Sequence, residues 1–166
     1  MNDEAKLPFA NAFWELRVYQ LTRDLQGQVF RLSKAFPSDE KFSLTDQMRR
    51  AARSIGAQIA EAWGKREYIK HFESKLTDAL SENNETQHWI ISAVDDGYLS
   101  PEISRPVFQL SLEVGRMLQS MIKRSNEFCH DPASSRLREP FPEFFIHPDE
   151  LPSSVESLLS ATSTKN

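Results

Sequence analysis

The sequence predicts an all-α protein, an antiparallel up-down four-helix bundle with an irregular, proline-rich C-terminal tail. Three observations support this fold class. Apolar residues recur every three or four positions in four separate segments, which is the period of helices that bury one face. Short breaks that contain proline, glycine or helix-capping residues separate these segments. After residue 128 the helical pattern stops and the composition changes.

The chain divides into three regions by composition. Its 166 residues, of which 39% are hydrophobic, suffice for one packed domain. We expect an N-terminal arm at residues 1–12, the bundle at 13–128 and an acidic tail containing Pro and Phe at 129–166. The aromatic stretch at 140–148 fits docking on the protein's own surface and binding to a partner equally well. No stretch approaches the roughly 20 apolar residues of a membrane span, so we expect a cytoplasmic protein with no membrane partner.

The first predicted helix ends at Pro37 and carries two apolar surfaces. Its core stripe has the three- and four-residue spacing of a bundle helix. This stripe consists of Trp14, Val18, Leu21, Leu25, Val29, Leu32 and Phe36. The opposite side carries four further large apolar residues, Phe13, Leu16, Tyr19 and Phe30. Such a group predicts a contact surface for another copy of the chain, unless the protein's own tail covers it.

The second predicted helix is capped by residues 43–46 and ends near Gly64. One arc of this helix is apolar and faces the core. It consists of Leu44, Met48, Ala51, Ala52, Ile55, Ile59, Ala62 and Trp63. The opposite side carries the small residues Gly56, Ala57, Ala60 and Gly64. Small side chains let a second helix approach closely. Since each glycine costs about 1 kcal/mol relative to alanine inside a helix, this face favours a contact function.

The third predicted helix spans residues 67–96, and the fourth opens at Ser100 and Pro101, which suit the N-cap and the first helical position. The third core stripe consists of Ile69, Phe72, Leu76, Ala79, Leu80, Ile90 and Val94. The fourth consists of Val107, Leu110, Val114, Leu118, Met121 and Ile122. Asn83 and Gln87 interrupt the third stripe. A buried polar group needs a hydrogen-bond partner, so we expect these two residues to fix the register between helices.

Residues 50–62 carry a family signature, Arg-Ala-Ala-x-Ser-Ile-x-x-Gln-Ile-Ala-Glu-Ala. With flanking motifs at residues 16–20, 36–40 and 97–99, it resembles the four-helix-bundle proteins encoded in bacterial 23S rRNA intervening sequences, often called S23 ribosomal proteins. It is more distantly similar to the accessory variability determinant of diversity-generating retroelements. The first resemblance implies a homopentamer. The second implies binding of RNA and a reverse transcriptase through a basic surface.

The sequence contains no strong signature of catalysis or metal binding. Cys129 lacks the nearby His and acid of a known cysteine-nucleophile signature. Glu85 and His88 have the Glu-x-x-His spacing of di-iron bundles, but such sites need two of these motifs and two further carboxylates that point inward. This single motif faces away from the predicted core. We therefore predict that the protein is no enzyme and holds no metal or cofactor.

Charge is segregated along the sequence, although the formal net charge is only −4. Residues 45–75 hold seven Lys or Arg and four acids, whereas residues 76–102 hold six acids and no Lys or Arg. Arginine suits phosphate because its planar guanidinium donates two parallel hydrogen bonds. The predicted nucleic-acid-binding residues are Arg49, Arg50, Arg53, Lys65, Arg66 and Lys70. The alternative is that the arginines pair with Glu61, Asp95 or Asp96 within or between subunits.

These features together predict a non-enzymatic scaffold that forms a closed ring, which by the family resemblance is a pentamer, and associates with nucleic acid. The ring follows from two different surfaces, the back of the first helix and the small-residue face of the second, which make a head-to-tail contact. The expected partners are further copies of the chain, RNA or DNA, and a reverse transcriptase or other protein. The alternative function is a protein–protein interaction module whose arginines are structural and whose tail recruits a partner.

Overall fold

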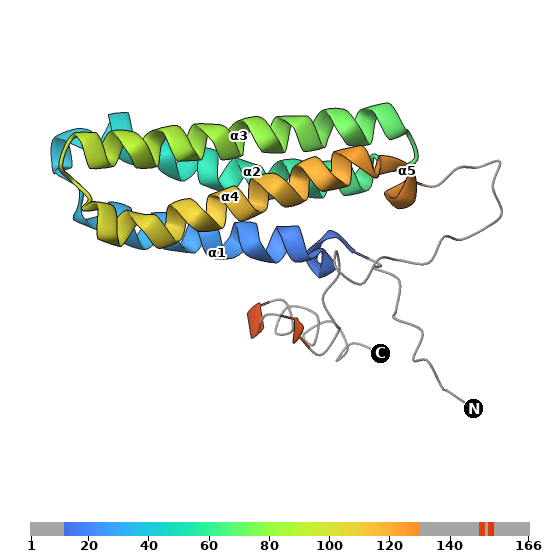
Figure 1. Cartoon of the computed structure of the whole chain (residues 1–166), viewed down its shortest axis with the longest axis horizontal. Helices are drawn as coiled ribbons and strands as arrows, with labels where there is room; N and C mark the ends of the chain where they lie inside the picture. Colours follow the sequence, from blue (N-terminus) through green and yellow to red (C-terminus); the bar gives the residue numbers. More distant parts are fainter. Residues whose placement is uncertain (1–11, 130–149, 152, 155–166) are drawn as a thin grey trace, which may run out of the picture.

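The computed structural model describes residues 12–129, 150–151 and 153–154. Four long helices run antiparallel through it, α1 (Arg17–Leu32), α2 (Asp46–Gly64), α3 (Ile69–Asp95) and α4 (Pro101–Lys123) (Figure 1). No strand occurs in these ranges. The predicted all-α four-helix bundle is therefore confirmed. The predicted arm at 1–12 and tail at 129–166 lie almost entirely outside the described residues.

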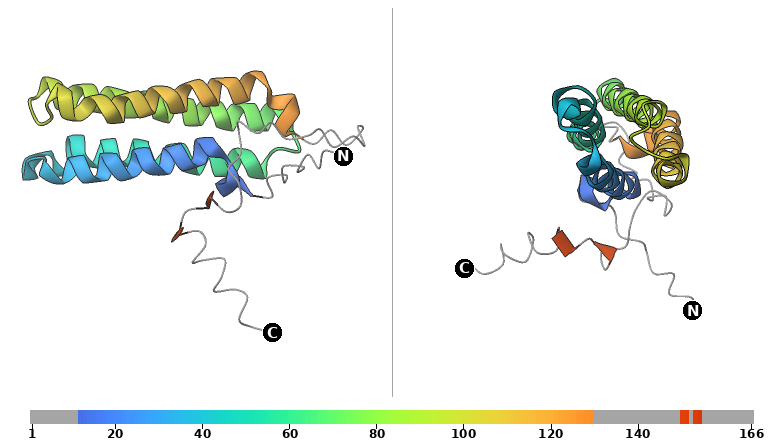
Figure 2. Two further views of the ribbon diagram at one scale, coloured as in Figure 1. Left: turned by 60° about the horizontal axis from the view of Figure 1, so that its bottom comes forward. Right: turned by 90° about the vertical axis from the view of Figure 1, so that its left-hand side faces the viewer.

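Short helical turns flank and connect the long helices. The turn η1 (Phe13–Glu15) precedes α1, and α5 (Ser125–Phe128) follows α4. Three turns lead from α1 to α2: η2 (Ser33–Ala35), η3 (Ser38–Glu40) and the π-helical η4 (Lys41–Thr45). These connectors lie at the same end of the bundle as the α3–α4 turn, and the α2–α3 turn lies at the opposite end (Figure 2).

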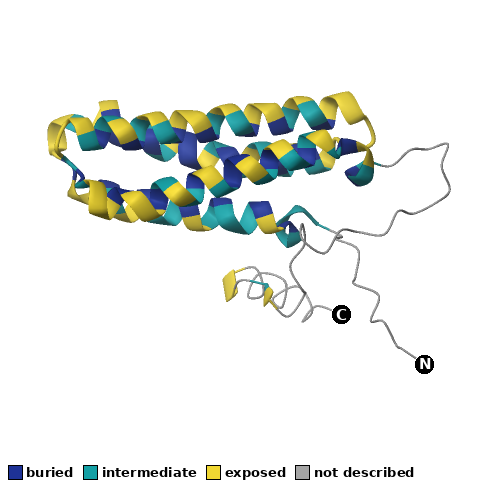
Figure 3. Ribbon diagram, in the orientation of Figure 1, coloured by how far each residue is buried: buried dark blue, intermediate teal, exposed yellow. Residues whose placement is uncertain are grey.

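The four helices enclose one hydrophobic core, because α1 and α3 each pack beside both α2 and α4. Buried residues follow the inner side of every long helix, while the outer sides are exposed (Figure 3). The largest fully buried side chains are Leu16, Val18, Leu25, Val29, Met48, Ile55, Ile59, Phe72, Leu76, Ile90, Leu118 and Met121. Most of the predicted core stripes are therefore confirmed, which shows that the apolar period alone identified the inward faces.

Some predicted core positions lie at the margin of the core. Ile69 was wrongly placed in it, since its side chain is 36% exposed. It is the first residue of α3 and stands at the bundle end, beside the turn at residues 65–68, where fewer neighbours surround it. Trp63, Leu80 and Leu110 are half-buried and pack against the core from its edge. The helical period gives the direction of a side chain, but its depth also depends on how close it lies to a helix end.

The start of α2 differs from the predicted cap. Ser43 lies inside η4, and the residue that accepts from the helical backbone is Glu40, whose Oε2 takes a hydrogen bond from the Leu44 amide at 3.3 Å. The Ser43 hydroxyl also donates to Glu40. The chain is helical from residue 38 onward, so the unsatisfied amides of the helix start lie earlier than the Ser43–Asp46 pattern indicates.

The turn from α3 to α4 follows the predicted chemistry. Gly97 has φ 76, a left-handed conformation that side chains disfavour, and it ends α3. Ser100 caps α4, because its Oγ accepts a hydrogen bond from the Ile103 amide at 3.3 Å and Pro101 follows it as the first helical residue.

Asn83 is completely buried between α3 and α4. Its Nδ2 donates to the Ser111 carbonyl at 3.0 Å. A Cβ added at Gly115 would lie 3.2 Å from the same Nδ2, so α4 offers glycine where the amide needs room. Gln87 is only half-buried. The Nδ2 of Asn83 thus has the predicted partner, whereas its buried Oδ1 has no hydrogen-bond partner among the described residues. The pairing with Ser111 suits a role in helix register.

Candidate nucleic-acid interface

Arg49 is held in place at the boundary between α2 and α1. Its Nε donates to the Ser33 Oγ at 2.7 Å. Its guanidinium carbon stands 4.9 Å from the ring centroid of Phe30, within cation–π distance. Ser33 in turn donates to the Phe30 carbonyl at 3.2 Å. The Nε is thus occupied, whereas the described residues give the two terminal nitrogens no hydrogen bond. Arg49 is therefore a cation with a fixed orientation, and its two terminal guanidinium nitrogens are available to an anion.

Arg50 and Arg53 are exposed on the outer side of α2. Neither makes an ion pair within 4.0 Å in the part of the chain that the structure describes. Burial raises the pKa of the Glu82 carboxyl on α3, the charge of Glu85 adds to this rise, and the charge of Arg50 opposes it. These two arginines therefore point to solvent with little neutralisation.

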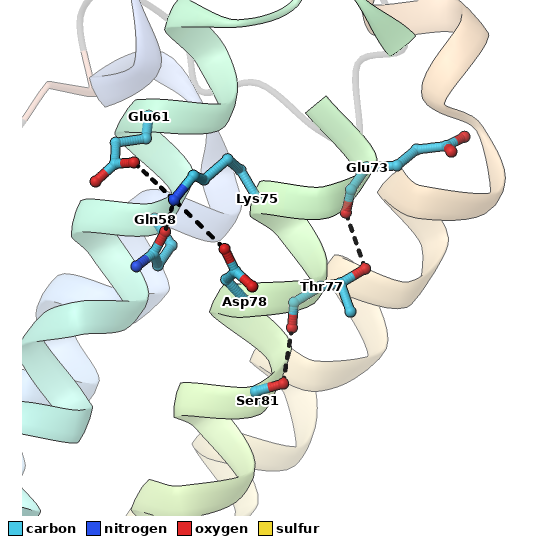
Figure 4. Close-up of polar contacts among 7 residues, drawn as sticks. All are labelled: Gln58, Glu61, Glu73, Lys75, Thr77, Asp78 and Ser81. Carbon is cyan, nitrogen blue, oxygen red and sulfur yellow. Dashed lines mark hydrogen bonds and ion pairs between the residues drawn. The ribbon is translucent and has the colours of Figure 1, made fainter. Parts of the chain in front are cut away.

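Glu61, which sequence reasoning offered as a partner for the arginines, is instead bound to Lys75 of α3. The Lys75 Nζ lies 2.9 Å from Glu61 Oε2 and 3.4 Å from Asp78 Oδ2, and donates to Gln58 Oε1 at 3.1 Å (Figure 4). The hydrogen bond from Lys75 lowers the pKa of the Glu61 carboxyl, and the same bond raises the pKa of Lys75. This network joins α2 to α3 and removes Glu61 from the arginines. An intramolecular pairing of Glu61 with them is therefore wrong.

The other three predicted cations form a separate cluster. Lys65, Arg66 and Lys70 lie at the α2–α3 turn, at the far end of α2 from Arg49. Arg66 stacks over Trp63 at 4.3 Å and donates to its carbonyl at 2.7 Å. A helical rise of about 1.5 Å per residue places Lys65 roughly 18 Å from Arg53 along the axis. The six predicted residues therefore belong to two clusters, not to one continuous patch.

Two lysines of the α1–α2 connector, Lys34 and Lys41, were not among the predicted residues. Lys34 shares the Phe30 ring with Arg49, because its Nζ lies 4.9 Å from the Phe30 centroid. Lys41 lies 5.1 Å from the ring centroid of Phe42, whose side chain is 79% exposed. Residues 30–53 together hold six Lys or Arg and three acids. Counting charge from residue 30 instead of residue 45 would have found this extension.

The predicted contact surface on the back of α1 is largely used for packing within the chain. Leu16 is buried, so its assignment to an outer interface is wrong. Its backbone is extended (φ −72, ψ 126) and it precedes the first residue of α1, so the helical wheel does not apply to it. Phe13 packs edge-on against Tyr19 at 4.9 Å. Of the four predicted residues, Phe30 alone is exposed, at 38%.

The small residues predicted to form a contact face on α2 also fall into two groups, one packed within the chain and one on the outer side. Gly56 faces α1, because an added Cβ would lie 3.4 Å from both Thr22 and Tyr19. It therefore serves packing within the chain, and its assignment to an outer contact is wrong. Ala57 and Gly64 are exposed, and Ala60 is half-buried. A Cβ at Gly64 would meet no atom within 4 Å.

Comparison with known proteins decides the family. The 23S rRNA-intervening sequence proteins match residues 14–120, which is more than half of the chain. The chain belongs to this family. A crystal structure of an S23 ribosomal protein family member of unknown function from Bacteroides thetaiotaomicron is similar to it at 30% sequence identity, with a TM-score of 0.58. The match covers 64% of this chain and 98% of that one. No curated protein matches the chain significantly.

The structure gives little support for metal binding or for nucleophilic chemistry at Cys129 in the described residues. Among the described residues, no group of three or more His, Cys, Asp or Glu could hold a metal ion. Glu85 accepts a hydrogen bond from Trp89 Nε1 at 3.0 Å, and His88 lies against the Trp89 ring at 4.7 Å. Burial raises the pKa of the Cys129 thiol to about 11, which disfavours the thiolate needed for nucleophilic chemistry.

Two further findings concern the tail and the membrane. Arg23 on α1 donates a hydrogen bond to the Ser154 Oγ at 3.1 Å, which connects one described piece of the tail to the bundle. The aromatic stretch at 140–148 lies outside the described residues. None of the helices in the described ranges is long and apolar enough to cross a membrane.

Proposed function

We propose that this protein is a non-enzymatic helical-bundle scaffold that binds RNA through the start of α2 and works as an assembly of several copies. The observation that carries the proposal is the state of the three arginines. Arg50 and Arg53 are exposed without an ion pair among the described residues, and Arg49 is preoriented by Ser33 and Phe30. Planar guanidinium groups in this state suit phosphate oxygens.

RNA is the first ligand to test because the family is named for 23S rRNA intervening sequences. DNA is the second, since phosphate contacts alone do not distinguish the two. A cytoplasmic location is part of the proposal, because ribosomal RNA is made there in bacteria. The reverse transcriptase stays a prediction that rests on the distant resemblance alone.

Assembly would supply affinity that one protomer lacks. A patch of three arginines offers few phosphate contacts, but a ring repeats it, and linked sites raise overall affinity without new contacts. We propose that Ala57, Ala60 and Gly64 form the contact with a neighbouring copy, since they leave the outer side of α2 open to a close approach. A homopentamer is the proposed closed form. Leu16 and Gly56 are not available for a contact between copies, because Leu16 is buried and Gly56 faces α1.

The test is RNA binding by fluorescence anisotropy at several salt concentrations, with the double variant Arg50→Ala, Arg53→Ala. We expect wild-type affinity to fall steeply with salt, and the variant to bind weakly with a shallower slope, by about 0.7 per lost contact on single strands. The matched control is Arg105→Ala, Arg116→Ala, which removes the same charge from exposed positions on α4. It should bind almost as wild type does.

Two outcomes would contradict the proposal. Equal losses in both double variants would show that only net charge matters. Absence of binding at low salt would favour the alternative, a protein–protein interaction module. One observation supports that alternative: Glu85 and Asp95 on α3 and Asp96 just after it are exposed and could pair with arginines of another copy. In that case Arg50→Ala, Arg53→Ala would lower the oligomer mass, which light scattering on the same samples measures.

A further inference from the structure

Phe42 is the most exposed large apolar side chain in the described part of the molecule, at 79%. Phe42 is not part of the hydrophobic core, to which Leu44 of the same turn contributes instead. An aromatic ring left in water without a packing role suggests a ligand that covers it. Lys41, whose ammonium stands 5.1 Å from the ring centroid, places a positive charge beside the same ring.

Arg49 lies farther along the same helical segment. Seven residues separate it from Phe42, which corresponds to about 10 Å along the axis at a helical rise. Its Nε bond to Ser33 and its contact with Phe30 fix the guanidinium plane. The terminal nitrogens remain for an anion, and a fixed fork loses less entropy when it binds phosphate. An exposed ring and a fixed cation therefore stand within reach of one short ligand.

Basic residues outnumber acidic ones around these groups by one, four to three. Lys34, Lys41 and Arg50 join Arg49, and the nearby acids are Asp39, Glu40 and Asp46. Glu40 accepts hydrogen bonds from Ser43, the Leu44 amide and Tyr98, which orient its carboxylate but leave its negative charge in place. The surface therefore suits a polyanion that also offers flat apolar groups.

Single-stranded nucleic acid combines these two properties. Its phosphates are anionic, and its unpaired bases expose faces that stack on aromatic rings. Bases in a duplex are already stacked on each other and present only their edges. We infer that the connector surface of this protein binds single-stranded nucleic acid, with a base stacked on Phe42 and a neighbouring phosphate held by Arg49. This inference rests on the proposed function and adds the form of nucleic acid that the surface accepts.

The test compares short oligouridylate with a duplex RNA of equal length, by fluorescence anisotropy on the full-length protein. Phe42→Leu keeps an apolar side chain but removes the aromatic face. We expect roughly tenfold weaker binding of the single strand, in line with measured base–aromatic stacking, with an unchanged salt slope and unchanged duplex binding. Phe42→Trp should restore the single-strand affinity. Because Phe42 is so exposed, we expect both variants to fold, which circular dichroism checks.

Tyr68 supplies the matched control. It is 63% exposed beside Lys65 and Lys70 at the opposite end of the bundle. Tyr68→Leu should leave the single-strand affinity at the wild-type value. Greater loss in Tyr68→Leu than in Phe42→Leu would place the single strand at the other cluster and overturn the inference.

The remaining outcomes separate this inference from the proposed function. Binding that falls in Arg50→Ala, Arg53→Ala but not in Phe42→Leu would overturn stacking and leave RNA binding intact. Equal losses for the single strand and the duplex would overturn it too. A lower oligomer mass in Phe42→Leu would show that the Phe42 side chain contacts another copy of the protein and would overturn stacking on a base. If the wild type binds neither RNA, both proposals are wrong.

Discussion

Tyr98 donates a hydrogen bond from its Oη to Glu40 Oε1 at 3.0 Å, across 58 residues of sequence. This bond ties the α1–α2 connector to the α3–α4 turn at one end of the bundle. Phe36 packs against the same tyrosine with ring centroids 5.9 Å apart. The connector that carries Phe42 is therefore fastened to the second pair of helices.

The Glu40–Tyr98 bond predicts a pH dependence of stability. Hydrogen bonds from Ser43, Tyr98 and the Leu44 amide lower the pKa of Glu40 below its ordinary 4.5. The bond to Glu40 raises the pKa of Tyr98 above 10.0. The stabilisation should be complete between these ordinary values. It is lost as pH falls through the lowered pKa of Glu40, and as pH rises through the raised pKa of Tyr98.

The variant that checks this is Tyr98→Phe, which we expect to lower the melting temperature modestly at pH 7. Its difference from wild type should shrink at acidic pH below 4.5. Tyr68→Phe is the control, because Tyr68 is exposed and has no hydroxyl contact of this kind among the described residues. A difference between Tyr98→Phe and wild type that stays constant from pH 7 to strongly acidic pH would contradict the assignment.

Gly115 predicts a substitution effect opposite to helix propensity. Alanine normally gains about 1 kcal/mol over glycine in a helix interior. At Gly115 the added Cβ would press on Asn83 Nδ2 at 3.2 Å, and Asn83 cannot retreat because it is buried and bonded to Ser111. We expect Gly115→Ala to destabilise the protein by about 1–3 kcal/mol, the range for overpacking a core.

Gly27 in α1 is the control for this effect. There an added Cβ would meet only the Arg31 guanidinium at 3.3 Å, the movable end of a flexible side chain. Gly27→Ala should therefore be neutral or stabilising by up to about 1 kcal/mol. Urea unfolding measures the free energy of unfolding of both variants. Destabilisation of similar size in both would contradict the explanation.

Lys75 predicts a salt-dependent stability. Its contacts with Glu61 and Asp78 join α2 to α3, and both partners are half exposed. Lys75→Met should keep the packing of the aliphatic stem and lower the melting temperature at low salt. The loss should be smaller at high salt, because salt screens exposed charges. RNA affinity should be affected less than in Arg50→Ala, Arg53→Ala, since the charge of Lys75 is already paired. A loss independent of salt would indicate a packing role instead.

The exposed small residues of α2 predict how an assembly is broken. Ala57→Leu with Ala60→Leu should dissociate the oligomer, because larger side chains keep a neighbouring helix at a distance. Helical content should change little, since leucine is a good helix former and Ala57 is exposed. Ala57→Ser with Ala60→Ser is the size-matched control and should preserve the mass. Sedimentation measures the oligomer mass of the wild type and of both double variants. A monomeric wild type at micromolar concentration would contradict the proposed ring.

The sequence by itself determined the bundle, because amphipathic periods report the buried side of each helix without any knowledge of its neighbours. It also determined the capping of α4 by Ser100 and placed Asn83 on the inward stripe of α3, although its burial was decided by the packing. These features depend on residues close together in the chain. The same reasoning failed at Leu16, since the helical period was extended into a turn that is not helical there.

Only the tertiary structure decided the candidate interface. Arg49 is oriented by Ser33, sixteen residues away, and Glu61 is bound by Lys75 across the α2–α3 boundary. Which of several acids a cation meets depends on the relative rotation and register of two packed helices, and a one-dimensional charge pattern contains neither. The separation of Arg53 from Lys65 has the same origin, because neighbours in a charge count can lie several helical turns apart.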